Sequence, residues 1–154
     1  MANLLAHALF ALALFSAGSS PISGAPLTAY GFYAAFASLA PDLGGGRIAR
    51  RTPYGHSLAY GFVWALLVLS LLSLAAWTGL VPTASFPLLV GACLTGLVSH
   101  LFLDALTPPG IWTWPRGGAR WGRFVWRGPR RGSGLNLSVS AFSLATILAL
   151  LILY

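Results

Sequence analysis

Apolar residues fill most of this chain and form five long runs, which are separated by short segments of glycine, proline and polar residues. The runs cover about residues 3–17, 27–40, 57–80, 86–106 and 135–154. The last three are long enough to cross a bilayer as helices, because a spanning helix needs about 20 mostly apolar residues. The first two are short, so we expect them to be tilted or partly re-entrant. The pattern predicts one all-α domain over residues 1–154, a polytopic membrane bundle of about five helices.

The composition agrees with a membrane location. Hydrophobic residues make up 57% of the chain and charged residues only 7%, whereas a soluble domain carries about a quarter charged residues. The first apolar run also looks like the core of a cleaved signal peptide. The residues before it carry no positive charge, which such a signal normally has, so we expect this segment to be retained as a helix.

The basic residues indicate an orientation in the membrane. The net charge is +7, and all the basic residues are arginines in the predicted loops 41–56 and 107–134. Positive loops favour the cytoplasmic side, which places the N-terminus inside and the C-terminus outside the inner membrane. Tryptophans alternate with arginines in the second loop, as is typical of a segment at the lipid headgroups. Nucleic-acid binding is the alternative for such a mixture, but an interfacial loop needs no such partner, and we expect none.

The few other ionisable residues all fall at the predicted cytoplasmic ends of the helices. They are His7, Asp42, His56, His100 and Asp104. The spacing of His100 and Asp104 puts them on one helical face, which continues through Ala92 and Gly96. Small residues at this spacing allow another helix to approach closely, so this face is expected to look into the bundle.

Imidazole and carboxylate groups are ligands for a divalent ion such as zinc or manganese. The sequence therefore predicts a metal pocket. The alternative is that the aspartates pair with nearby arginines while the histidines donate to backbone carbonyls. Spacing alone leaves both interpretations open.

Three motifs resemble those of a known family. "GLVSHLFLDALTPPGIWTWP", "RTPYGHSL" and "LAPDLG" match its "GYLSHxxxDxLTPxGVxxxxP", "THSL" and "PD" motifs in order. The chain thus resembles the membrane-bound metal-dependent hydrolases, including the bacterial inner-membrane family described as LexA-binding. The resemblance implies a metal site whose residues, carried over by position, are His7, Asp42, His56, His100 and Asp104.

The chain also departs from the family pattern at several positions. Gly44 and Gly45 stand where the family has a second Asp and often a His, and Gly55 stands where it has Thr. A further family histidine has no counterpart near Arg50 and Arg51. With fewer ligands, the resemblance implies either a one-metal site or a pocket that has lost its metal, and not a two-metal centre.

These observations together predict a metal-dependent hydrolase of the inner membrane that acts on an ester or phosphoester. Asp42, His56, His100 and Asp104 are the predicted ligands, and His7 is a ligand or the general base. Arg51 or Arg116 would hold an anionic group of a membrane-proximal substrate, because guanidinium suits phosphate.

The alternative function is a non-catalytic scaffold or subunit whose His and Asp residues only lock the helix ends together. A transporter would need polar groups near the bilayer midplane, and the sequence places none there. The sequence does not predict an oligomeric state.

Overall fold

The computed structural model describes residues 4–23, 29–44, 56–106, 110–114, 120–121 and 133–153, and the fold is given for these ranges. Within them the chain forms five α-helices: α1 (Leu4–Ser23), α2 (Ala29–Gly44), α3 (Leu58–Trp77), α4 (Phe86–Ala105) and α5 (Ser133–Leu153). A short 3-10 helix, η1 (Thr83–Ser85), leads into α4. Two short strands follow α4, β1 (Ile111–Trp112) and β2 (Arg120–Trp121). The predicted all-α bundle is confirmed.

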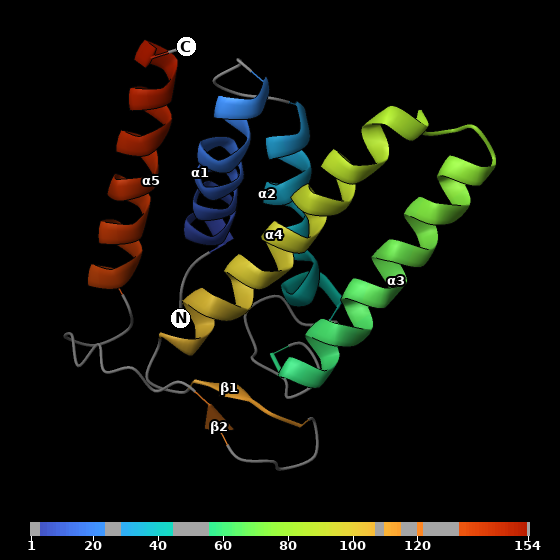
Figure 1. The fold of residues 1–154 in the computed structure, drawn as a ribbon. Helices are drawn as coiled ribbons and strands as arrows, with labels where there is room; N and C mark the ends of the chain where they lie inside the picture. The colour runs from blue at the N-terminus through green and yellow to red at the C-terminus, as the bar shows by residue number, and fades with distance from the viewer. Residues whose placement is uncertain are drawn as a thin grey trace.

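Helix α4 lies at the centre of the bundle. It packs against α1, α2 and α3, while α5 packs on α1 (Figure 1). Helix α1 begins at the end of the bundle where α4 ends, and α5 ends at the opposite end (Figure 1). The arrangement brings the start of α1, the end of α2, the start of α3 and the end of α4 to one end of the molecule.

Small residues form the inside of the bundle. Ala11, Ala34 and Ala92 are fully buried. A Cβ added at Gly96 of α4 would collide with the carbonyl oxygen of Ala34 and would lie 2.8 Å from the Cβ of Ala37, both on α2. Helices α2 and α4 therefore touch at the backbone, as the stripe of Ala92 and Gly96 predicted. Small residues at such contacts are typical of helix packing in membranes.

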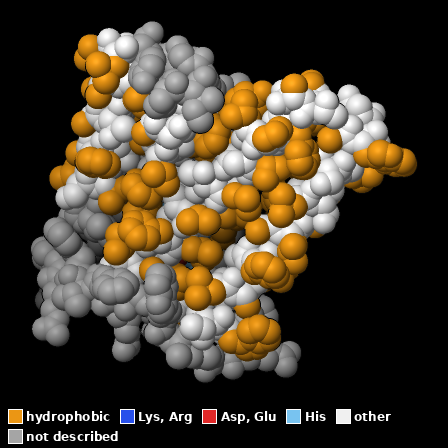
Figure 2. All heavy atoms as spheres, in the orientation of Figure 1, with side chains coloured by type: hydrophobic (Ala, Val, Ile, Leu, Met, Phe, Trp, Pro, Cys, Tyr) orange, Lys and Arg blue, Asp and Glu red, His pale blue; other side chains and the backbone are white. Residues whose placement is uncertain are grey.

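Large apolar side chains lie on the outside. Phe36, Phe62 and Trp77 are 72%, 67% and 85% exposed. Figure 2 shows one face of the molecule, where apolar side chains cover α3 and α4 and no charged or histidine side chain of the described residues is in view. Two described segments, Leu58–Trp77 and Thr83–Ala105, are long and apolar enough to cross a membrane. Leu4–Ser19 and Leu137–Leu153 are shorter apolar stretches.

Three helices end at different residues from those predicted. Helix α1 continues to Ser23 and is 20 residues long, so it is not short as expected. Its Gly-Ser stretch stays helical, and the hydroxyl of Ser19 donates to the carbonyl of Ser16 within the helix. Helix α2 continues through Pro41 to Gly44, so Asp42 lies in its last turn and does not follow it. Helix α3 ends early, at Trp77, because Gly79 adopts a positive φ of 77°.

A small antiparallel hairpin was not predicted. Strands β1 and β2 pair Ile111 with Trp121 and Trp112 with Arg120. Trp112 also forms a parallel bridge with Ser57, the residue that caps the N-terminus of α3. The hairpin therefore ties the segment after α4 to the start of α3.

Candidate metal centre

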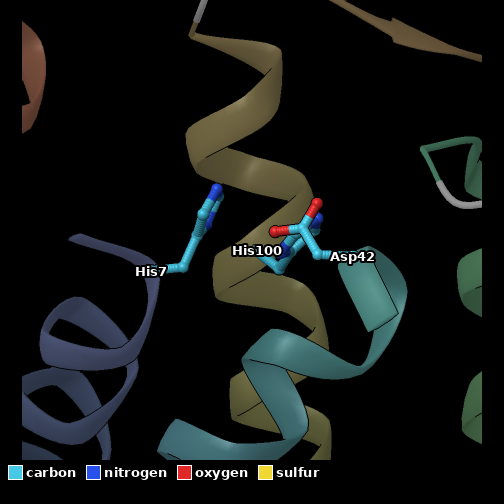
Figure 3. Close-up of side chains that lie close together, drawn as sticks. All are labelled: His7, Asp42 and His100. Atoms are coloured by element: carbon cyan, nitrogen blue, oxygen red, sulfur yellow. The ribbon is translucent and has the colours of Figure 1, made fainter. Parts of the chain in front are cut away.

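The three histidines and two acidic residues of the chain meet in one cluster, which we call the His/Asp centre. Its members are His7, Asp42, His56, His100 and Asp104. They come from α1, the last turn of α2, the residue before the N-cap of α3 and the last two turns of α4. Figure 3 shows His7, Asp42 and His100 directed toward one another from three different helices. The predicted convergence is thus present in the structure.

His56 lies between the two carboxylates. Its Nδ1 is 2.6 Å from Oδ2 of Asp104, and its Nε2 is 3.4 Å from Oδ1 of Asp42. The backbone around it is held on two sides. The amide of Trp112 donates to the His56 carbonyl at 3.0 Å, and the Ser57 hydroxyl accepts from the amide of Tyr60 at 3.2 Å. The hairpin and the helix cap together hold the backbone at His56, from which the ring reaches the two carboxylates.

His100 and His7 complete the cluster from α4 and α1. The Nε2 atom of His100 lies 3.3 Å from Nδ1 of His56 and 3.5 Å from Oδ2 of Asp104. The Nε2 atom of His7 lies 3.7 Å from Oδ1 of Asp104. The rings of His7 and His100 are stacked, with centroids 4.2 Å apart and planes inclined by 23°. Every ring of the centre therefore has a nitrogen close to a carboxylate.

The close contact of α2 with α4 positions Asp42 beside His100. A Cβ on Gly96 would lie 2.9 Å from the amide nitrogen of Ser38. Asp42 is one helical turn after Ser38, and His100 is one turn after Gly96, because a turn takes 3.6 residues. The two helices thus meet one turn before Asp42 and one turn before His100, and the absence of a side chain at Gly96 makes that approach possible.

The centre is almost closed to solvent. The exposed fractions of His7, His56, His100 and Asp104 are 1%, 4%, 0% and 2%, and the Asp42 side chain is 14% exposed. Burying a carboxylate is costly unless a positive charge or hydrogen bonds compensate it. All arginines of the chain lie where no side chain is described, so the alternative of Asp–Arg pairs is untested.

The family model described as YdjM inner membrane protein matches residues 1–154, the whole chain. The chain belongs to the YdjM inner membrane protein family. No curated protein and no solved structure matches it. Family membership confirms the predicted inner-membrane protein and agrees with the apolar exterior of the bundle. The family's description states neither a hydrolase activity nor a metal.

The donor atoms of the His/Asp centre fit a metal ion. Two overlapping trios each offer ligand atoms within 4.8 Å of one another: His7, Asp42 and His100, and His56, His100 and Asp104. Two ligands on a tetrahedral zinc lie about 3.3 Å apart, given zinc–ligand bonds of about 2.0–2.1 Å. The shorter contact between His56 and Asp104, 2.6 Å, is a hydrogen bond. Nδ1 of His56 and Oδ2 of Asp104 would therefore have to move apart before both of these atoms bound one ion.

Other predicted residues fall outside what the structure describes. Arg51 and Arg116, the predicted anion-binding residues, lie outside the described residues, as do Gly45 and Gly55. Sequence reasoning missed the role of Trp112, whose backbone amide holds His56. The motif "TPPGIW" contained a signal for it, since a Pro-Gly turn followed by two large apolar residues is typical of a strand start.

Proposed function

We propose that this YdjM-family protein is a metal-dependent hydrolase of the inner membrane that cleaves an ester or phosphoester. The observation that carries the proposal is the His/Asp centre, in which all the histidines and acids of the chain gather in one buried cluster. Ionisable residues inside a membrane protein are costly and mark function by default. A chain that has so few of them and places them all together uses them for one task.

The charges of the centre favour one divalent ion. Asp42 and Asp104 contribute two negative charges when ionised, and a single divalent ion balances both. A second divalent ion would leave two positive charges uncompensated in a nearly closed site, which is costly. One bound ion also agrees with Gly44 and Gly45, which stand where the hydrolase family that the motifs resemble has a second Asp and often a His.

The residues of the centre take separate roles in the proposal. Asp42, His56, His100 and Asp104 hold the ion, and His7 is a further ligand or the base that accepts a proton from the attacking water. When bound, the ion would polarise the oxygen of the substrate and make a water molecule more acidic. The packing of α1, α2 and α4 around the cluster excludes other water, which strengthens every electrostatic interaction there.

The proposed location is the cytoplasmic face of the inner membrane, with the N-terminus inside and the C-terminus outside. The two arginine-bearing segments join helices at the end of the bundle that holds the centre, and positive loops favour the cytoplasm. Arg51 or Arg116 would bind the anionic group of the substrate, since guanidinium forms paired hydrogen bonds with phosphate.

Metal analysis of the purified protein tests this proposal. We expect about one zinc or manganese ion per chain in the wild type and at least about tenfold less in His100→Ala, because ligand loss removes affinity by that order or more. Val98→Ala, on the exposed side of the same helix, is the control and should keep the metal. A folded wild type that takes up no zinc or manganese on loading would contradict the proposal.

A helix-locking scaffold is the second candidate. It is favoured by the direct side-chain contacts within the centre, which already link α1, α2, α4 and the start of α3. Turnover of p-nitrophenyl butyrate or bis(p-nitrophenyl) phosphate separates the two functions. Turnover that a chelator abolishes and that His7→Ala lowers supports the hydrolase. Bound metal with no turnover, and a lower melting temperature after chelation, supports the scaffold.

A further inference from the structure

An apolar groove lies between α1 and α4, beyond the His/Asp centre along both helices. Its volume is about 490 Å³, and its walls include Leu14 and Phe15 of α1 and Leu94 and Val98 of α4. On α4 the lining residues run from Pro87 to Val98, a length of about 16 Å at 1.5 Å per helical residue. The groove therefore runs along both helices, which form its sides.

Two glycines keep this groove open without serving the packing of the bundle. A Cβ added at Gly18 would meet nothing within 4 Å, and a Cβ added at Gly91 would only touch Phe15 at an ordinary 3.8 Å. Both glycines line the groove, and neither has a positive φ. Glycine in a helix costs about 1 kcal/mol relative to alanine. In contrast to Gly96, these glycines bring no helices together, and their effect is empty space.

The apolar lining of the groove indicates what kind of molecule it binds. Most of the surface is apolar, and the Ser19 hydroxyl is already used by its hydrogen bond to the carbonyl of Ser16. An extended peptide in the groove would leave its backbone polar groups without partners in an apolar surrounding, which is costly. A hydrocarbon chain has no such groups. In an inner-membrane protein the abundant hydrocarbon chains are those of lipids.

The groove and the centre share their two helices. Leu14 is two turns after His7 on the same face of α1. Val98 lies two residues before His100, at a similar depth on the other side of α4, because two residues turn a helix by about 200°. An amphiphile whose tail fills the groove thus has its polar end at the depth of the centre. We propose that the α1–α4 groove holds one acyl chain of a lipid substrate whose ester or phosphoester group lies at the His/Asp centre. The substrate part of this inference rests on the proposed function, whereas the binding of the chain does not.

Photolabelling of the full-length protein tests the binding of the chain. The probe is phosphatidylglycerol with a diazirine in its acyl chain, in vesicles of phosphatidylethanolamine and phosphatidylglycerol. We expect adducts on Leu14 and Leu94 to exceed those on Leu66 of α3. Gly91→Leu should lower the groove adducts at least about fivefold, because the added side chain occupies the volume that the chain contacts. Ser70→Leu, on the exposed side of α3, is the control and should change nothing.

Each outcome decides for or against the groove. Equal labelling of α3 and the groove in wild type, or unchanged groove labelling in Gly91→Leu, would overturn the inference in favour of ordinary lipid around the bundle. If Gly91→Leu does not fold, Gly91→Ala replaces it, since its Cβ makes only an ordinary contact, and a smaller but measurable loss of labelling is expected.

A second comparison separates the groove from the proposed reaction. Groove labelling that persists in a protein without metal or turnover contradicts the hydrolase and leaves the chain-binding site standing. In an active protein, p-nitrophenyl laurate should be cleaved faster than p-nitrophenyl butyrate, and Gly91→Leu should remove that preference. Equal turnover of both esters by wild type would overturn the link between groove and centre.

Discussion

Helices α3 and α4 have the same length and a similar hydropathy, but they differ in how deeply they are buried in the bundle. Each has 20 residues, and their spanning windows have mean hydropathies of 2.2 and 1.9. Yet only 6% of the α3 window is buried, against 39% for α4. Helix α4 carries His100 and Asp104, whereas no histidine or charged residue lies within α3. Hydropathy thus indicates that a helix belongs in the membrane, and ionisable and small residues indicate where in the bundle it lies.

The two helices also differ in what their glycines touch. A Cβ at Gly96 of α4 would strike the backbone of α2, whereas a Cβ at Gly61 of α3 would lie 2.5 Å from the tip of the Leu101 side chain. A side-chain tip can rotate away, but a helix backbone cannot move without its neighbours. Changes in α4 are therefore expected to reach the His/Asp centre, and changes in α3 are expected to stay local.

The largest expected difference in stability between variants of the two helices comes from Asp104, the buried carboxylate of α4. Asp104→Ala removes the shared partner of His7, His56 and His100, and breaking a buried ionic or hydrogen-bonded group costs about 3–5 kcal/mol. Ser73→Ala, on the exposed side of α3, should change the free energy of unfolding by less than about 0.5 kcal/mol. Titration with dodecyl sulfate, followed by circular dichroism, measures both. Similar values for the two variants would remove the energetic distinction between α3 and α4.

A smaller effect on stability is expected from substituting one glycine in each of the two helices. Gly96→Ala should destabilise the protein by about 1–3 kcal/mol through overpacking, and it should also lower metal content, because α2 and α4 move apart beside Asp42 and His100. Gly61→Ala should cost less than about 1 kcal/mol, since the tip of Leu101 can adopt another rotamer. The same unfolding titration and a metal analysis check both. A larger loss in Gly61→Ala would show that α3, and not α4, sets the spacing of the helices.

The convergence of the His/Asp centre could be predicted because the chain has so few ionisable groups. His7, Asp42, His56, His100 and Asp104 each lie near a predicted helix end, and alternating crossings bring those ends to one side. The inward face of α4 was also predictable from Ala92 and Gly96. Both predictions depend only on the period of a helix and on the length of the apolar runs.

Features that depend on contacts between distant segments were not predictable in the same way. The hairpin that holds His56 joins Trp112 to Ser57 across the length of two helices. The end of α1 was misplaced because serines that terminate helices in water can donate to their own helix, as Ser19 does. The α1–α4 groove forms only where one face of α1 meets one face of α4, so it cannot be predicted from the sequence of either helix alone.

The smallest expected difference in stability is between two leucine-to-alanine variants, one on each helix, and it tests whether α3 faces lipid. In water, Leu→Ala in a core costs both the transfer of the side chain and the cavity that it leaves. In a bilayer the transfer part nearly vanishes, because lipid is as apolar as leucine. Leu97→Ala on α4, whose side chain is 3% exposed, should therefore cost only the lost packing, about 1–2 kcal/mol. Leu66→Ala on α3, 49% exposed, should cost close to nothing, because lipid fills the space. Unfolding titrations that give Leu66→Ala the larger cost would mean that a protein surface, and not lipid, covers α3.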